Sequence, residues 1–309
     1  MAGRKVIYIQ IVSLLFLYAC RGREVTIPLA YEGDKLVIWG RLQAGKPIKI
    51  KIGRTFPAVG AIPGQIAVTM ANVSLYKNGS FYVHLSHSSH EEGVYVSDSL
   101  IRAGEIYMIK AEATGFPTAI SAPVKIPESI PKLTYILTKD VPGTKLPLVP
   151  QDLISLYFEP NDQIVNSYVA VGFLASFQEV ALPTNWPTAD NIIANEEDCH
   201  AWATDPEKKF GNLFLINGSC VVKNRPLNFS VASGNFSKLP NSKGEYERAY
   251  QLTMLVASIT EGWFVYNQIE GNQPGGLDHL VVPLQMAYSN IENGYGMVYG
   301  MNLQQIELK

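Results

Sequence analysis

Hydrophobic and polar residues alternate with a period of two along much of this chain. In "PIKIKIG" (47–53), Ile48, Ile50 and Ile52 fall on one face, whereas Lys49 and Lys51 fall on the other. Such alternation predicts a β-strand with one buried and one solvated face. The preceding "DKLVIWGRL" (34–42) follows the same pattern. We therefore expect antiparallel β-structure at the start of the fold.

A β-hairpin is predicted in "VSLYKNGSFYVHL" (73–85), where Asn78-Gly79 separates two β-rich runs. Asn-Gly favours a type I′ turn, because both central residues of that turn need a positive φ. A two-residue turn sets the strand register, for which we expect the pairs Lys77–Ser80, Leu75–Tyr82 and Val73–His84. A further strand is expected in "EIYMIKAEATGF" (105–116), after a turn at Ala103-Gly104.

Pro127 and Pro131 punctuate the middle of the chain, and we place a domain boundary near residues 127–132. Residues 25–131 hold about seven short strands at turn spacings typical of an antiparallel sandwich. Residues 132–309 contain long strand candidates at 164–177 and 249–259. Thr260 can cap a short helix after the second of them. The expected fold is all-β, with an N-terminal immunoglobulin-like or transthyretin-like sandwich followed by a larger β-domain with a short helix.

Residues 1–19 have the features of an export signal. Arg4 and Lys5 precede the apolar stretch 6–19, and Cys20 follows it. This stretch is shorter than the roughly 20 residues that span a bilayer as a helix. The ending "LYAC" is similar to a bacterial lipobox, from which Tyr18 departs by its size. We expect cleavage before Cys20, acylation of Cys20 and a short tether at 20–24. An ordinary signal peptide or a buried apolar strand are the alternatives.

Charge argues against one class of partner. Removing residues 1–19 takes away two of 25 basic residues and none of 27 acidic ones, so the net charge changes from −2 to −4. Nucleic-acid binding requires a basic surface, and none is expected here. The remaining chain has no second apolar run long enough to cross a membrane. We therefore expect membrane lipid as a partner only through the acylated Cys20.

Two further cysteines, Cys199 and Cys220, remain after Cys20. An even pair in an exported chain favours a disulfide, because oxidising compartments preserve such bonds. Two reduced buried thiols are the alternative.

The segment "YVHLSHSSHEE" (82–92) contains His84, His87 and His90. Zinc requires three or four converging ligands. His84 and His87 have odd spacing, so on a strand they point to opposite faces. A solvated polar loop is the simpler interpretation, and metal binding by these histidines is kept as an alternative.

Motifs of catalysis and cofactor binding are missing from the sequence. We find no G-x-S-x-G elbow, no H-E-x-x-H and no phosphate-binding loop, and we expect no cofactor. Aromatic side chains gather in the second half, and we assign them to the core. They are Trp186, Trp202, Phe236, Trp263, Phe264 and Tyr266.

Several segments in order resemble a family of Bacteroidota lipoproteins described as domain of unknown function 4249. They are the lipobox, "KLVIWGRL", "GEIYMIKAEATGFPTAISAPVKIP", "FEPNDQIVNSYVAVGF" and "SNIENGYGMVYGMN" (289–302). The last is similar to the family's glycine-rich ending, with Tyr299 in place of its usual phenylalanine. We expect Gly294, Gly296 and Gly300 to mark positive φ or close packing, not ligand binding.

The resemblance implies an outer-membrane lipoprotein whose gene lies near a TonB-dependent transporter, and it carries over no catalytic residue. We expect a non-catalytic accessory or binding partner of such a transporter. The alternatives are metal or siderophore capture by the histidine segment, a structural envelope protein and an extracellular hydrolase. Surface display in this group is often signalled by acidic residues after the cysteine, but "RGRE" (21–24) is mainly basic. The sequence thus leaves open whether the protein faces the periplasm or the cell surface.

Overall fold

The structure is a computed structural model. It describes residues 31–57, 64–141, 151–159, 164, 167–177, 181–183, 188–189, 197–205, 211–222, 225–235, 240–244, 246–271 and 288–309. The predicted signal segment, the tether, Cys20, Trp186 and Phe236 lie outside these residues. Residues 34–55 and 63–309 form one compact unit, and all features below lie within it. None of the helices in the described part of the chain is both long and apolar enough to cross a membrane.

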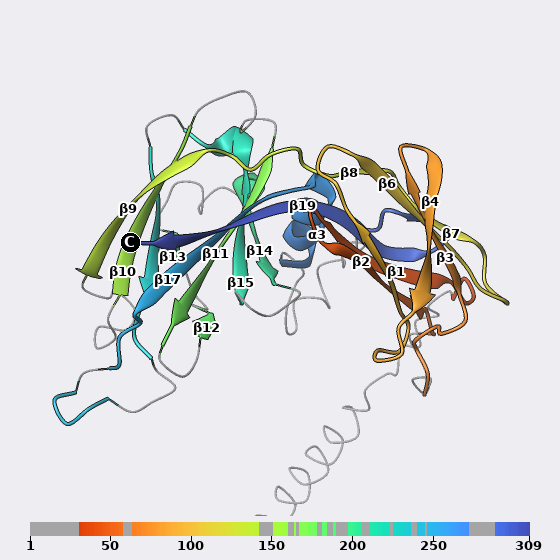
Figure 1. Ribbon diagram of the computed structural model, residues 1–309, viewed down its shortest axis with the longest axis horizontal. Coiled ribbons are helices and arrows are strands. Elements are labelled where there is room, and N and C mark those ends of the chain that lie inside the picture. Colours follow the sequence, from red (N-terminus) through yellow and green to blue (C-terminus); the bar gives the residue numbers. More distant parts are fainter. Residues whose placement is uncertain are drawn as a thin grey trace, which may run out of the picture. The chain divides into compact units, whose positions relative to one another are not determined.

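Strands dominate the described chain, as Figure 1 shows. In the first half these are β1 Leu36–Gln43, β2 Pro47–Arg54, β3 Asn72–Lys77, β4 Ser80–His87, β5 Val94–Leu100, β6 Ile106–Glu112, β7 Ala119–Ser121, β8 Val124–Lys125 and β9 Leu133–Val141. The second half adds β10 Gln151–Phe158, β11 Tyr168–Ser176, β12 Ala181–Pro183, β13 Thr188–Ala189, β14 His200–Thr204, β15 Asn212–Asn217, β16 Leu227–Ala232, β17 Gln251–Ile259, β18 Ile291–Glu292 and β19 Tyr295–Leu308. The helical elements are η2 Glu197–Cys199, η3 Gly218–Cys220 and α3 Glu261–Gly271.

The first sandwich has one layer in the order β19-β1-β2-β5 and another in the order β4-β3-β6-β7-β18, with β4 also pairing β5. The predicted alternation in β2 is confirmed. Ile48, Ile50 and Ile52 are fully buried, whereas Lys49 and Lys51 are exposed. The isoleucines pack in one cluster with residues of the facing layer, including Val73 and Leu75 of β3 and Ile109 of β6. The hydrophobic effect on this shared face therefore holds the two layers together.

The predicted hairpin forms, but most of its expected register is wrong. Asn78 and Gly79 have φ of 50° and 80°, as the turn requires, and Lys77 faces Ser80. A bulge then shifts the pairing between Leu75 and Tyr76. The observed pairs are Tyr76–Phe81, Leu75–Val83, Ser74–His84 and Val73–Leu85. The shift brings Leu85 into the core and leaves His84 exposed, which the burial of apolar side chains favours.

The C-terminal strand β19 belongs to both sandwiches. Its first half pairs in parallel with β1, from Val37–Tyr295 to Gln43–Met301, and its second half pairs with β17. Figure 1 shows this long blue strand running from β1 to the C-terminus. Ile291 and Val298 join the core of the first sandwich. Residues from the N-terminal strand β1 and from the C-terminal part of the chain therefore pack in one hydrophobic core.

The glycines of the C-terminal motif take the structural roles that the sequence predicts. Gly296 has a φ of +105°, and a Cβ there would overlap the backbone of Ile38. At Gly294 and Gly300 a Cβ would approach Leu36 O at 2.7 Å and the Cδ1 of Ile126 at 2.9 Å. Close packing against β1 and the first core thus explains all three positions.

The second sandwich packs the layer β14-β15-β11-β17-β19 against the sheet β13-β16-β10-β9. Their shared core includes Phe173 of β11, Phe214 of β15 and Phe229 of β16, all fully buried. Strands β11 and β17 are buried on both faces, which explains their nearly continuous apolar sequences.

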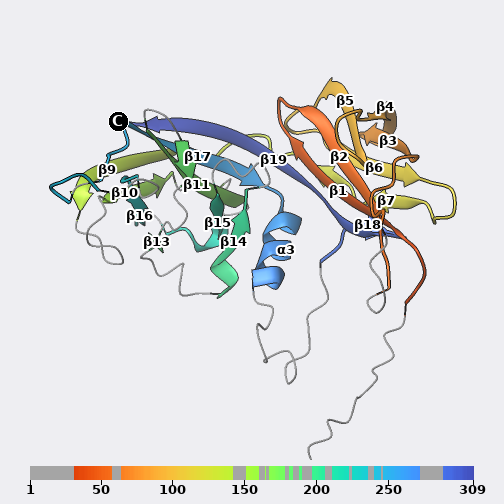
Figure 2. The ribbon, with the colours of Figure 1, turned by 90° about the horizontal axis from the view of Figure 1, so that it is seen from below.

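Helix α3 covers the other face of this layer. Trp263 and Phe264 pack with Leu215, Leu255 and neighbouring residues in a separate cluster. Figure 2 shows α3 beside β14 and β15. Thr260 precedes the helix, and its Oγ1 accepts a hydrogen bond from the Gly300 amide at 3.2 Å. The predicted all-β fold, with a sandwich first and a larger β-domain bearing a short helix, is confirmed.

Candidate functional site

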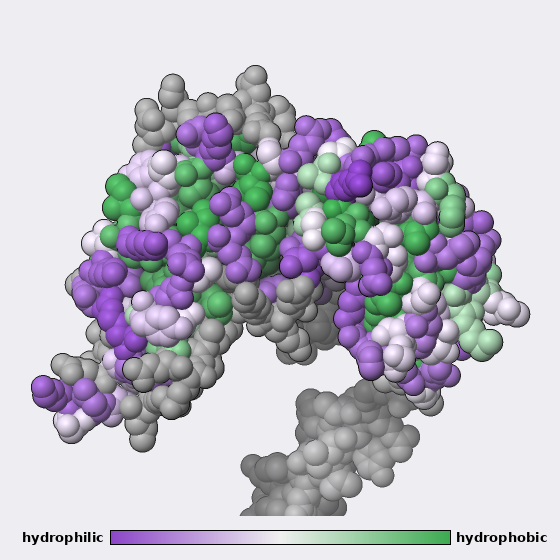
Figure 3. All heavy atoms as spheres, in the orientation of Figure 1, coloured by the Kyte–Doolittle hydropathy of each residue, from purple (hydrophilic) through white to green (hydrophobic). Residues whose placement is uncertain are grey.

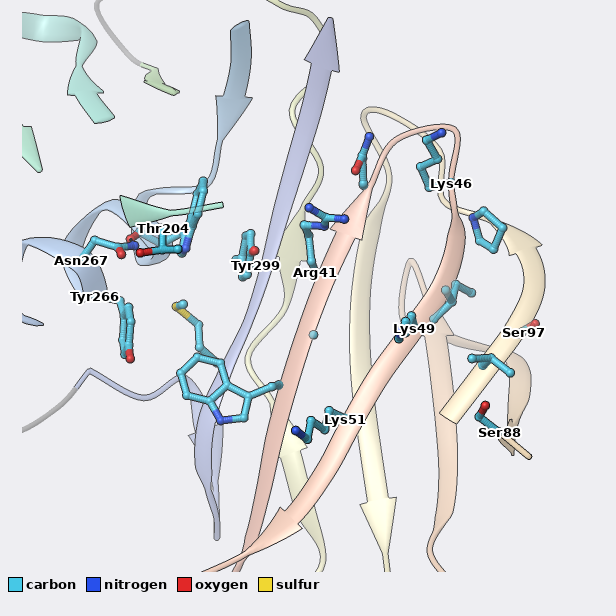
Figure 4. A pocket seen from close by; sticks show the side chains of 18 of the residues that line it. Arg41, Lys46, Lys49, Lys51, Ser88, Ser97, Thr204, Tyr266, Asn267 and Tyr299 are labelled. Atoms are coloured by element: carbon cyan, nitrogen blue, oxygen red, sulfur yellow. Dashed lines mark hydrogen bonds between the residues drawn. The ribbon is translucent and has the colours of Figure 1, made fainter. Parts of the chain in front are cut away.

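A pocket of about 1170 Å³ is bounded by the outer face of the first sandwich and by α3 and β14. Figure 4 shows Arg41, Lys49 and Lys51 on the sheet side and Thr204, Tyr266 and Asn267 on the other, with Tyr299 of β19 between them. The lining residues are Trp39–Arg41, Gln43, Lys46–Lys49, Lys51, Ser88, His90, Val96–Asp98, Trp202, Thr204, Trp263, Tyr266, Asn267, Glu270, Gly271, Met297 and Tyr299.

The sheet wall is a direct consequence of strand alternation. Ile48, Ile50 and Ile52 point into the core, so Lys49 and Lys51 of β2 point outward into the pocket lining. Trp39 of β1 faces Lys51 on one side and Met297 of β19 on the other. Adjacent strands therefore place an indole, a thioether and an ammonium in one row across the sheet.

The opposite wall is aromatic. Trp263 of α3 stacks on Tyr299 of β19, with ring centroids 4.7 Å apart and an interplanar angle of 9°. Tyr266, one helical turn further, meets the ring of Trp39 at 5.5 Å edge to face. Trp263 is 3% exposed and serves the core, whereas Trp39 and Trp202 are 38% and 40% exposed. Trp39 of β1 on the sheet side and Trp202 of β14 on the opposite side thus both line the pocket with accessible indole surface.

Charged side chains line both walls. Arg41 Nη1 lies 3.8 Å from Asp205 Oδ1, and Lys49 Nζ lies 2.7 Å from Glu91 Oε1. The hydrogen bond and charge of Lys49 lower the pKa of the Glu91 carboxyl. Neither Lys46 nor Lys51 forms an ion pair with another described residue. Two lysine ammonium groups are therefore available in the lining.

Tyr266 is the most perturbed acid of the pocket. Burial raises the pKa of its phenol to about 12, and its hydrogen bond to Glu270 acts in the same direction. The phenol consequently stays protonated at neutral pH and serves as a hydrogen-bond donor.

The three predicted histidines do not come together. His84 Nδ1 is 3.0 Å from Ser74 Oγ, whereas His87 Nε2 accepts a hydrogen bond from the Gly93 amide at 3.2 Å. His90 lines the pocket and donates its backbone amide to Ser88 Oγ at 3.2 Å. No group of three His, Cys, Asp or Glu side chains among the described residues could hold a metal ion. Their odd spacing on β4 separates His84 from His87, as alternation of strand faces requires.

Cys199 and Cys220 form a disulfide with a Cα–Cα distance of 5.7 Å. It joins η2 to η3, which flank the antiparallel pair β14 and β15. The bond therefore closes this end of the second sandwich near the strand that carries Trp202.

The assignment of the second-half aromatics to the core is right for Trp263 and Phe264 but wrong for Trp202. Sequence reasoning also missed the pocket, although two signals for it were present. Trp39 takes an outward position in an alternating strand, beside outward lysines of the next strand. An exposed indole on a strand face indicates a binding surface.

Figure 3 shows hydrophobic and hydrophilic residues interspersed on one face of the molecule.

A second pocket, of about 580 Å³, lies around Val124–Ser129 and Tyr288. It has fewer aromatic residues in its lining than the first pocket, and none of them is a tryptophan. The pocket beside Trp39 is therefore the candidate site.

No curated protein matches this chain by sequence. Among solved structures, it is similar to an Escherichia coli alpha-2-macroglobulin activated by porcine elastase, with 11% identity, a TM-score of 0.24 and coverage of 74% of this chain and 19% of that one. It is also similar to a β-glucuronidase from glycoside hydrolase family 2, with 10% identity, a TM-score of 0.22 and the same coverages. The chain spans about a fifth of the length of either protein, and similarities this low say nothing about function. A family model described as "Domain of unknown function (DUF4249)" matches residues 23–307, and this chain belongs to that family.

Proposed function

We propose that this protein is a non-catalytic, lipid-anchored protein of the outer membrane that binds a ligand in the pocket beside Trp39 and serves a TonB-dependent transporter. The observation that carries the binding role is the pocket itself. Its volume of about 1170 Å³ exceeds the roughly 300–1000 Å³ typical of small-molecule sites. Accessible indoles and a few converging polar groups are the usual composition of such sites.

The anchoring part of the proposal rests on the sequence. Arg4 and Lys5, the apolar stretch 6–19 and Cys20 together support export and acylation. Two or three acyl chains anchor a protein stably, whereas a single chain binds membranes marginally. The transporter as partner is supported by the resemblance of the chain to lipoproteins whose genes lie beside such transporters.

Affinity purification from native outer membranes in mild detergent tests this role. We expect a TonB-dependent transporter to co-purify with the tagged protein in a stoichiometric amount. Recovery of the protein alone, under conditions that keep other transporter complexes intact, would refute stable docking. The Cys20→Ala variant is the matched control for anchoring, and we expect it to leave the membrane fraction.

A further inference from the structure

The accessible groups of the pocket divide into two kinds. Aromatic surface comes from Trp39, Trp202 and Tyr266, and positive charge that is unpaired among the described residues comes from Lys46 and Lys51. The two kinds meet at Trp39, which faces Lys51 directly across β1 and β2. A ligand in the pocket therefore meets a ring-binding surface and a cationic surface side by side.

Ion pairs neutralise part of the charge in the pocket. Arg41 pairs with Asp205 and Lys49 with Glu91. Lys46 and Lys51 also line the pocket, and neither forms an ion pair with another described residue. These two ammonium groups can therefore pair with acidic groups of a ligand.

The pocket also has uncharged side chains that can form hydrogen bonds. Gln43, Ser97, Thr204 and Asn267 all line the pocket, and Tyr266 keeps its phenolic proton at neutral pH. Such a mixture suits the many hydroxyls of a sugar, whose C–H face also packs on an indole. Asn267 Nδ2 already donates to Trp263 O at 2.6 Å, and Ser97 Oγ accepts from the Ser99 amide at 3.3 Å. A fully apolar ligand would still shield the remaining hydrogen-bonding capacity of these groups from water, which is costly.

From these observations we propose that the pocket binds an acidic oligosaccharide. Sugar rings pack on Trp39 and Trp202, and carboxylate or sulfate groups pair with Lys46 and Lys51. The volume of about 1170 Å³ has room for several rings, not one. This inference rests on the proposed binding function and names the ligand class of the same site.

The test is titration calorimetry of the purified protein with three acidic tetrasaccharides: tetragalacturonate, tetramannuronate and a chondroitin sulfate tetrasaccharide. Methyl-esterified tetragalacturonate keeps the rings and loses the charges, so it is the matched neutral probe. We expect at least one acidic probe to bind, and the neutral probe to bind about ten-fold more weakly. Binding should weaken between 50 and 500 mM NaCl, because salt screens exposed charges.

Variants locate the binding. Trp39→Ala and Lys51→Gln should each weaken binding of the acidic probe about five- to ten-fold. Lys132→Gln removes an exposed charge outside the pocket and should change affinity less than about two-fold. Circular dichroism and the melting temperature of each variant separate a loss of binding from a loss of folding.

Each contrary result overturns the proposal. Equal affinity for the neutral probe refutes the anionic ligand, and an unchanged affinity of Trp39→Ala refutes the site. Binding of 2,3-dihydroxybenzoate without binding of any tetrasaccharide refutes the sugar. If no acidic probe binds while the transporter co-purifies, the ligand class is wrong and the accessory role stands.

Discussion

Replacing Gly296 with alanine tests whether the C-terminal strand closes the first sandwich. Gly296 has a φ of +105°, a backbone conformation that L-residues avoid. A Cβ at this position would overlap the carbonyl oxygen of Ile38 and lie 2.9 and 3.0 Å from the carbonyl carbon and the amide nitrogen of that residue. These are backbone atoms of β1, so no rotamer change relieves the overlap.

The expected loss of stability has two parts. The positive φ costs about 1–2 kcal/mol for a residue with a Cβ. Displacing β1 from β19 around Ile38 weakens about two ladder hydrogen bonds, at about 1 kcal/mol each. We therefore expect Gly296→Ala to lower the free energy of unfolding by about 3–4 kcal/mol. Gly45 is the control, because its φ is +73° and a Cβ there meets nothing within 4 Å.

Guanidinium unfolding followed by tryptophan fluorescence measures both variants. Trp39, one of four tryptophans, faces Met297, the residue after Gly296, so part of the emission comes from this strand pair. We expect Gly45→Ala to lose only about 1–2 kcal/mol. If the two variants lose equal free energies of unfolding, the close approach of β19 to β1 contributes nothing and the reasoning fails.

Three other predictions concern different parts of the chain. Breaking the disulfide with Cys199→Ala/Cys220→Ala should cost about 3 kcal/mol of unfolding free energy, and a reductant should lower the guanidinium midpoint of the wild type but not of this variant. Arg248→Met removes the ion pair, 2.5 Å long, of Asp152, which is 3% exposed and keeps, among the described residues, only neutral donors such as the Asp140 amide. We expect a loss of about 3 kcal/mol of unfolding free energy that adding Asp152→Asn largely restores. Because the pKa of Tyr266 is raised to about 12, its stabilising contribution is complete below pH 10 and is lost as the pH rises through 12. The difference in phenolate absorbance between wild type and Tyr266→Phe should therefore appear near pH 12, and a difference centred near pH 10 would contradict burial of this phenol.

Local patterns were sufficient for the individual elements. The alternation of isoleucine and lysine predicts β2 and its buried face, because neighbouring side chains on a strand point to opposite sides. Asn78-Gly79 predicts its turn because few residues tolerate positive φ. The helix after Thr260 and the packing role of Gly296 also follow from features within a few residues of each.

The hairpin register shows where local reasoning stopped. The turn alone favours pairing Val73 with His84, but the structure pairs Val73 with Leu85 across a bulge. Burial of Leu85 in a core shared with β1, β2 and β6 decides this outcome. That core is built from residues far apart in the sequence, so the turn could not predict the bulge.

The sequence by itself determined the all-β class, the strands with one solvated face, the cysteine pair and the family. Only the tertiary structure decided that β19 pairs in parallel with β1, and that Trp39 and Lys51 share a pocket with Trp202 and α3. The physical reason is the range of the interactions. Backbone conformation and alternation depend on near neighbours, whereas pairing and pockets depend on which apolar faces bury each other across the whole chain.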